Sequence, residues 1–424
     1  MSLAYIKNPS NELFTLEYIV EMGTNSDRKL DAALRYLEYL GTSTLSPADL
    51  KKEFFKLGLS FNVFPSQDRV YVSLSGLEQN LEKGVKLFEQ LLSDAQPNPA
   101  ALPELVKDIL KERNDNLKDK FSIMYNGLFS YARYGEQSPL KAALSLDELD
   151  ALTPAELVDR IHAINSYEHH VFYYGQKSAD NVKAMLDKLH KTPAKLKPVL
   201  PAEDFKEVET TGNTVLFADH DMVQTELMMV SKAGLFDAKK LPIAQLFNEY
   251  FGSGLSSIVF QEIREAKALA YSAYASYTSP RKKEEAHYVR AFLGTQADKL
   301  NNAVEAMSGL MAEMPMNEKQ FEGAKDAAMK RIESERTTKE AIYWSWDSAK
   351  RLGLDHDVRK DNYERIKLLT LADLKAFFTA EIKGRNYTYL LIGKESAVDM
   401  NAIGKLGTVR KLSKLDLFGY DAMP

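Results

Sequence analysis

The residues best suited to chemistry lie in segment 251–277, where an arginine and a tyrosine are seven positions apart. The turn Gly252-Ser253-Gly254 is expected to open a short amphipathic helix that carries Arg264 and ends near Leu269. An aromatic-rich strand carrying Tyr271 should follow. A guanidinium and a phenol are strong hydrogen-bond donors, and donors held at a fixed joint can stabilise developing negative charge.

The glycine turn itself does not predict a phosphate-binding loop. It lacks the lysine and the preceding buried strand that such loops require. The structural alternative for the two donors is an arginine paired with Glu262 or Glu265 and a tyrosine half-buried in a sheet. Both interpretations depend on what holds the joint in place.

Composition indicates a globular protein of ordinary character. The 424 residues are 45% hydrophobic and 27% charged, with a net charge of −5, which gives no electrostatic reason to expect a nucleic-acid partner. No apolar run reaches the length of a membrane span. The absence of cysteine excludes disulfides and thiolate chemistry. The sequence does not fix the cellular compartment, and we expect the bacterial periplasm or the cytoplasm.

The sequence repeats itself at a spacing of about 210 residues. A strand that ends at Gly23 has a counterpart ending at Gly234, and a helix that stops at Gly41 has one stopping at Gly252. Leu59-Ser-Phe-Asn62 likewise parallels Leu269-Ala-Tyr-Ser272. Because several pairs stay nearly in register, we interpret the chain as two copies of one domain.

Each copy is predicted to be an α+β domain, with helices covering a largely antiparallel sheet. We expect the first domain over residues 1–190, a proline- and lysine-rich linker over 191–212 and the second domain over 213–424. Strands are expected at 13–22 and 169–174, among others, from their alternating or β-branched and aromatic residues.

Two such domains in tandem, with Gly-x-Gly-x-Ser-Ser, Phe-Gln-Glu-Ile-Arg and Leu-Ala-Tyr in the second, resemble one half of a pitrilysin-family zinc peptidase. This family includes insulin-degrading enzyme and mitochondrial processing peptidase. The resemblance covers nearly the whole chain. It implies that Arg264 and Tyr271 reach toward a separate zinc-bearing half, where they bind the substrate backbone and stabilise the oxyanion.

The zinc motif of active members, His-x-x-Glu-His on a helix, corresponds here to Arg35-Tyr36-Leu37-Glu38-Tyr39. Both histidines are replaced, and a guanidinium has no lone pair to offer a metal. Glu112 falls near the position of the third ligand. We therefore expect no metal in this chain, zinc in the partner half, and Glu38 and Glu112 as surface or ion-paired carboxylates.

The leading hypothesis is a non-catalytic half of a zinc metalloendopeptidase, inactive by itself. Its partner would be a His-x-x-Glu-His half in the same longer polypeptide or in a separate subunit, and the substrate an unfolded peptide. The short stretch before the first strand favours an excised half. A structural scaffold subunit and an isolated peptide-binding module are the alternatives. The sequence does not reveal which peptide substrate would be cut or at which residues.

Overall fold

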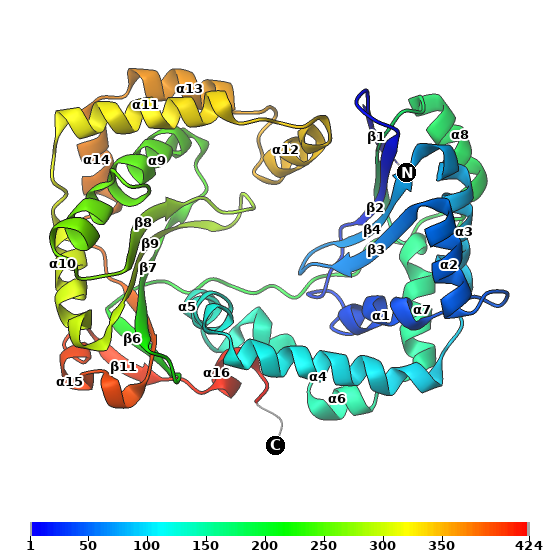
Figure 1. The fold of residues 1–424 in the computed structure, drawn as a ribbon, viewed down its shortest axis with the longest axis horizontal. Coiled ribbons are helices and arrows are strands. Elements are labelled where there is room, and N and C mark those ends of the chain that lie inside the picture. The colour runs from blue at the N-terminus through cyan, green and yellow to red at the C-terminus, as the bar shows by residue number, and fades with distance from the viewer. Residues whose placement is uncertain (1, 422–424) are drawn as a thin grey trace.

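The computed structural model describes residues 2–421, which form two halves, each built on one open sheet (Figure 1). The first half lies on the right of the view and the second on the left, and an irregular segment crosses between them. This confirms the predicted α+β class with two similar sheets and covering helices. The boundaries of the two domains in the sequence stay a prediction.

The first half contains five strands and eight α-helices. The strands are β1 Ser2–Lys7, β2 Leu13–Val20, β3 Leu59–Pro65, β4 Val70–Leu77 and β5 His169–Gly175. The helices are α1 Leu30–Tyr36, α2 Pro47–Leu57, α3 Leu81–Asp94, α4 Leu102–Lys118, α5 Phe129–Tyr134, α6 Leu146–Asp150, α7 Pro154–Ala163 and α8 Ala179–Leu189. A π-helical turn, Ser122–Leu128, joins α4 to α5.

The second half contains six strands and eight α-helices. The strands are β6 Thr214–Asp219, β7 Gln224–Leu235, β8 Ser272–Thr278, β9 Ala286–Gln296, β10 Thr388–Gly393 and β11 Thr408–Lys411. The helices are α9 Leu241–Phe247, α10 Leu300–Ala312, α11 Glu318–Ser334, α12 Lys339–Arg351, α13 Arg359–Leu368, α14 Leu371–Glu381, α15 Met400–Ile403 and α16 Lys414–Phe418. Two π-helical segments, Asn248–Gly252 and Phe260–Ala266, precede β8.

The two sheets have the same topology. Their strand orders are β1-β5-β2-β4-β3 and β11-β6-β10-β7-β9-β8, so among residues 2–421 the second sheet has one strand more, β11. In each sheet the first strand pairs in parallel with the last long strand, β1 with β5 and β6 with β10, and the other pairs of this shared order are antiparallel. The repeat predicted from the sequence is therefore present in the fold.

Alternation along the strands explains where the main cores lie. In β2, Phe14, Leu16 and Tyr18 are buried under the helices of the first half, while Glu17 and Ile19 point to the opposite face. That opposite face of each sheet is covered by elements from the other half. In the first sheet, Ile19 and Phe172 pack against Tyr343 of α12, whose ring stacks on Phe172 at 4.0 Å.

The second sheet is covered in the same way by the first half. Residues 117–131, which include the π-helical turn, pack on the face formed by Leu216, Met228 and Leu390. The C-terminal helix α16 joins this cluster through Phe418. Figure 1 shows α12 reaching toward the first sheet and α4–α5 reaching toward the second. Each half thus contributes a helical segment to the core of the other.

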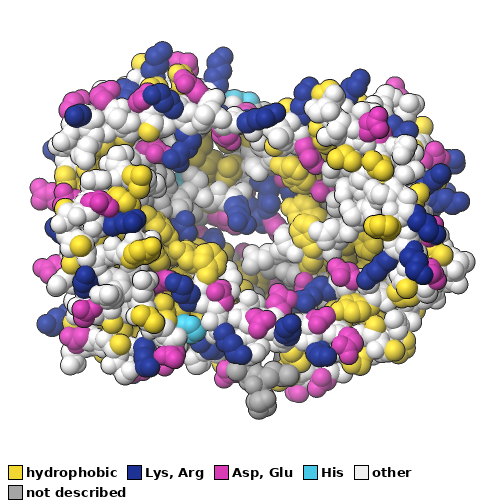
Figure 2. Space-filling view, in the orientation of Figure 1, with side chains coloured by type: hydrophobic (Ala, Val, Ile, Leu, Met, Phe, Trp, Pro, Cys, Tyr) yellow, Lys and Arg dark blue, Asp and Glu magenta, His cyan; other side chains and the backbone are white. Residues whose placement is uncertain are grey.

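Ion pairs reinforce the contact between the halves. The buried Arg69 guanidinium, before β4, binds Asp347 of α12 with nitrogen–oxygen distances of 2.5 and 3.1 Å. Neighbouring Asp68 pairs with Lys282 at 2.7 Å and also with Arg351. The surface is hollowed between the halves in Figure 2, and a cavity of about 540 Å³ there is lined partly by linker residues 202–207.

Segment 191–212 has no regular helix or strand, as its prolines predict. It is nevertheless held in place, since Glu207 binds Arg133 at 2.5 Å and the Glu203 amide donates to the Asn25 carbonyl at 2.8 Å. Among the residues described, no helix is long and apolar enough to cross a membrane.

Candidate functional site

Arg264 and Tyr271 lie at the joint between a helical segment and an edge strand. The helical segment ends at Ala266, three residues earlier than the expected end near Leu269, because the chain turns through a left-handed residue at Ala268. Tyr271 immediately precedes β8 rather than lying within it, although its amide already donates to the Gly294 carbonyl of β9 at 2.8 Å. Both residues are therefore fixed by backbone structure.

The side chains of this pair are exposed and face each other. Tyr271 is 72% exposed, and the Arg264 side chain is 42% exposed. The guanidinium carbon of Arg264 lies 5.5 Å from the centre of the Tyr271 ring and 4.9 Å from that of Phe260. The nearest carboxylate, Glu265 Oε1, is 3.8 Å from Arg264 Nε, too far for a hydrogen bond. Tyr271 is not half-buried in a sheet, so this part of the structural alternative is wrong.

Ala268 sets the direction in which the chain leaves the helical segment. Its φ is +47°, the only positive φ of a non-glycine residue among the residues described. The equivalent position in the first half, 210 residues earlier, is Gly58, with φ +62° at the end of α2. Glycine adopts this conformation freely, whereas for alanine its conformational free energy is about 1–2 kcal/mol higher. Strain of this kind is often retained at functional sites.

Several contacts pin the joint after Ala268. The Ala268 amide donates to the Arg264 carbonyl at 3.1 Å, and the Thr295 hydroxyl donates to the Leu269 carbonyl at 2.5 Å. Lys299 Nζ reaches the Ala268 carbonyl at 3.3 Å. Sequence reasoning did not identify Ala268 or Thr295 as supports. The alignment of residue 268 with Gly58 was the available signal for Ala268.

The glycine-rich turn supports the strand that follows Tyr271. A Cβ at Gly252 would lie 1.7 Å from the Ala275 carbonyl oxygen, so only glycine allows the turn to pack against β8. Asn248 binds both backbone groups of Tyr277, accepting from its amide at 2.8 Å and donating to its carbonyl at 3.1 Å. The turn therefore has a structural role, as predicted, and it holds β8 in place.

The first half has an apolar pair at the equivalent positions. Phe54 and Phe61 pack with ring centres 5.0 Å apart, and Phe54 is buried. The two copies differ in side chains and in backbone here, since Phe54 lies in the α-helix α2 and Phe61 within β3, whereas Arg264 lies in a π-helical segment and Tyr271 precedes β8. The polar pair occurs only in the second copy, and a structural role alone does not require it.

The positions of the zinc motif do not fit a zinc ion. Arg35 Nη1 binds Glu112 Oε2 at 2.7 Å, and the Tyr39 hydroxyl donates to Asp108 at 2.5 Å. This hydrogen bond is the main reason why the pKa of Tyr39 is raised to about 12. The ordinary α-helix ends at Tyr36, and a 3₁₀ turn carries Glu38, which is exposed. No group of three potential ligands is assembled among the residues described.

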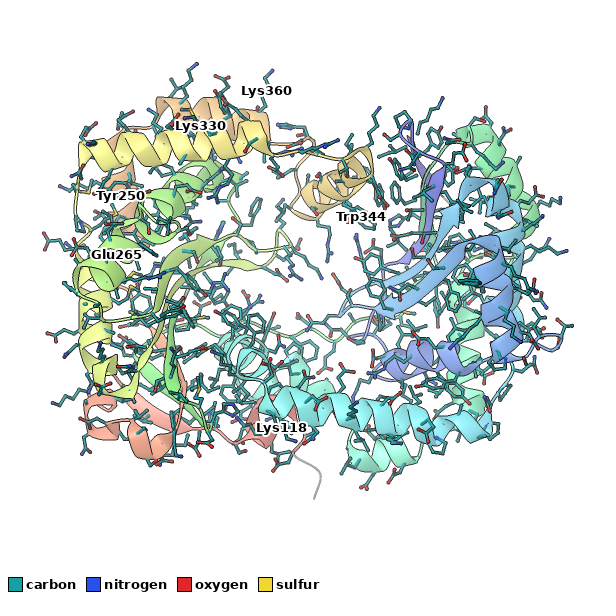
Figure 3. The ribbon with its side chains drawn as sticks, in the orientation of Figure 1. Lys118, Tyr250, Glu265, Lys330, Trp344 and Lys360 are labelled. Carbon is teal, nitrogen blue, oxygen red and sulfur yellow. The ribbon has the colours of Figure 1, made fainter. Side chains whose placement is uncertain are left out.

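The structure does not bring these two sets of residues together. Arg35 and Glu112 join α1 to α4 in the first half, whereas Arg264 and Tyr271 belong to the second. Figure 3 labels Glu265, the neighbour of Arg264, on the outer side of the second half, away from the first half and the linker. The exposure of the Arg264 and Tyr271 side chains leaves the donor pair accessible from outside the chain.

The part of the chain that carries the donor pair is similar to known proteins. The sequence profile described as "Peptidase M16 inactive domain" matches residues 169–328, which include Arg264 and Tyr271. The predicted resemblance to the pitrilysin (M16) family is confirmed. A Bacillus subtilis protein described as "Probable inactive metalloprotease YmfF" is 24% identical over 266 residues, covering 61% of each chain.

Solved structures show the same fold. A peptidase M16 inactive domain from Pseudomonas fluorescens has a TM-score of 0.73 and 17% identity, with 94% of this chain and 96% of that chain covered. The ferredoxin protease FusC, solved as a mutant in complex with Arabidopsis ferredoxin, has a TM-score of 0.69 and 12% identity. There the similarity covers 92% of this chain and 44% of FusC. The first curated relatives are matched over 56–61% of their own length.

Proposed function

We propose that this M16 chain is the non-catalytic half of a zinc metalloendopeptidase that degrades or processes peptides. In this proposal it closes the chamber over a catalytic half and supplies Arg264 and Tyr271. The observation that carries the proposal is the arrangement of these two donors, which are adjacent, exposed and set on a rigid joint. The same joint in the first half carries two phenylalanines.

The chemistry expected of the pair is binding of the substrate backbone and stabilisation of an oxyanion. A guanidinium and a phenol donate hydrogen bonds, and they can stabilise a negatively charged oxygen without transferring a proton to it. In an enclosed site one such donor can lower a barrier by about 3–4 kcal/mol. Arg264 rests against two aromatic rings, so moving toward a substrate costs it no buried ion pair.

The partner in this proposal carries His-x-x-Glu-His and holds the zinc that this chain lacks. The two halves belong either to one longer polypeptide or to separate subunits. Similarity to 44% of FusC supports the first arrangement, and similarity to 96% of the Pseudomonas chain supports the second. The substrate is an unfolded peptide, and this chain alone is inactive.

Reconstitution with the catalytic half tests the proposal. Turnover of a quenched-fluorescence peptide of mixed sequence is measured with wild type, Arg264→Ala and Tyr271→Phe. Loss of a donor to the oxyanion should lower kcat about 10²–10³-fold, with assembly unchanged by gel filtration. Lys267→Ala is the matched control, since Lys267 is an exposed cation of the same joint.

Two results would separate the alternatives. Equal turnover for wild type and both variants would reject a catalytic contribution and leave a scaffold subunit. Peptide cleavage by the isolated chain, blocked by a chelator, would contradict the assignment of a non-catalytic half.

A further inference from the structure

A groove lies between the edge strand β1 and helix α12, on the sheet of the first half, whereas Arg264 belongs to the second half. Its volume is about 780 Å³. One wall is formed by residues 2–6 of β1, and the other by one face of α12. The floor contains Glu21, Arg69 and His170 from the ends of the neighbouring strands.

The groove follows the free edge of β1 as well as the face of the sheet that α12 covers. Successive side chains of a strand point to opposite faces, yet residues 2, 3, 4, 5 and 6 all line the cavity. Their common feature is the backbone along the edge. β1 pairs only with β5 and ends the sheet on this side, so its outer amides and carbonyls have no strand partner in the described chain.

The exposed part of the α12 wall is apolar and ends in two cations, Lys350 and Arg351, of which Arg351 is paired with Asp68. Ile342, Trp346 and Lys350 are four residues apart and share one face of the helix. Ile342 is 50% exposed and Trp346 45% exposed. Lys350 Nζ lies 4.4 Å from the centre of the Trp346 ring and forms no ion pair with any described residue. The wall therefore offers an apolar surface followed by a positive charge that is free of direct ion pairs among the described residues.

The floor is rigid, and its one guanidinium is shared by two carboxylates, which leaves one net negative charge. Arg69 binds both Asp347 and Glu21, the latter at 2.8 Å, and His170 Nε2 lies 2.8 Å from the Tyr343 hydroxyl. The Tyr343 ring is stacked on Phe172. Groups that are already paired have little to gain from a ligand. Recognition thus depends on the β1 backbone and the α12 wall.

We propose that this groove binds an extended peptide segment, which adds a strand to β1. Its backbone pairs with β1, an apolar side chain lies against Ile342 and Trp346, and a carboxylate lies near Lys350. The carboxylate comes from an acidic residue or the peptide's C-terminus. Such strand addition combines main-chain hydrogen bonds with side-chain pockets. β1 is six residues long, which sets the length of the paired segment.

The occupant is a single strand rather than the sheet edge of a second copy. α12 lies beside the free edge along the groove. A folded sheet with its own covering helices would therefore clash with this helix. A single extended chain fits between the two walls. The positive charge of Lys350 also favours a partner that brings a carboxylate.

Direct binding to the isolated chain tests the inference, without the catalytic half and independently of the proposed function. The probe is a fluorescein-labelled eight-residue peptide of alternating valine and threonine, with a central leucine and a free C-terminal carboxylate. Saturable anisotropy is expected for this peptide. A version with two central prolines cannot pair along a strand and should bind at least ten-fold more weakly.

Variants then locate the site. Trp346→Ala and Lys350→Glu should each weaken binding about ten-fold or more, and amidation of the peptide C-terminus should have the effect of Lys350→Glu. Phe55→Ala and Lys360→Glu are controls, since Phe55 is 85% exposed and Lys360 exposed outside the groove. Circular dichroism confirms folding of each variant.

Three results would overturn the inference. They are no saturable binding of the peptide, equal binding of the proline-containing peptide, and binding that the two groove variants leave unchanged. Sedimentation showing a dimer that Trp346→Ala dissociates would assign the groove to a second copy instead.

Discussion

The Arg35 guanidinium lies 2.7 Å from the Glu112 carboxylate and links α1 to α4, at positions that the resemblance aligns with the zinc motif. A cation of the protein itself thus stands beside Glu112, the carboxylate that the resemblance aligns with the third zinc ligand. The pair is partly exposed, with side-chain exposures of 31% and 58%. We therefore expect it to contribute little to stability.

The first prediction concerns metal binding and this ion pair. Purified wild-type chain should contain well below one zinc per chain, because no imidazole is present at residues 35 and 39. Arg35→Ala should lower the free energy of unfolding by less than about 1 kcal/mol. Elemental analysis and urea unfolding measure the two quantities. A zinc content near one per chain would contradict the interpretation of the motif.

The second prediction concerns the strained joint. Ala268→Gly should raise the free energy of unfolding by about 0.5–1 kcal/mol, since relief of the left-handed strain exceeds the extra flexibility of glycine in the unfolded chain. Ala327→Gly, at an exposed position within α11, is the control and should lower it by about 1 kcal/mol. A loss of stability in Ala268→Gly would show that the positive φ carries no strain.

The third prediction concerns the close approach of the glycine turn to β8. Gly252→Ala should lower the free energy of unfolding by about 1–3 kcal/mol, because the new methyl group meets the Ala275 carbonyl. Gly309→Ala is the matched control in α10, where a Cβ meets nothing within 4 Å. There the substitution should stabilise the helix by about 0.5–1 kcal/mol. Equal effects at the two sites would refute the packing argument.

The fourth prediction concerns pH. Burial raises the pKa of Glu17 from 4.5 to about 7, and repulsion from Glu340 of α12 adds to this, while a hydrogen bond from Ser73 opposes it. Between these two pKa values the folded chain holds a proton that the unfolded chain releases. Raising the pH from about 4.5 to 7 should therefore weaken folding, by about 2–3 kcal/mol from this group.

Glu17→Gln isolates this effect. The variant cannot titrate at this position, so its stability should fall less than that of wild type between pH 5 and pH 8. Urea unfolding at both pH values gives the difference. An identical pH dependence of wild type and variant would show that Glu17 keeps an ordinary pKa in the folded chain.

Much of the fold could be predicted from periodicity and self-similarity. Alternating residues located β2, and the spacing between Gly23 and Gly234 indicated the repeat that the two sheets display. The same alignment of the two repeats matched Arg264 with Phe54 and Tyr271 with Phe61. These signals are local or depend on comparing two segments of the same chain, so they need no knowledge of tertiary contacts.

The remaining features depend on contacts between distant segments. The α12 sequence does not predict that Tyr343 stacks on Phe172 of the other half, because an apolar helix face can pack against any apolar surface. The left-handed Ala268 was missed for a related reason, since alanine usually signals a regular helix. The early end of the helical segment, and with it the exact position of Tyr271, follows from that residue.

The exchange of helical segments between the halves also bears on whether the halves can move relative to each other. Tyr343 is buried in the first half and Met124 in the second, so separating the halves would expose two apolar faces and break the Arg69–Asp347 pair. An interface of this kind resists hinge motion. We infer that the two halves of this chain move together as one rigid body.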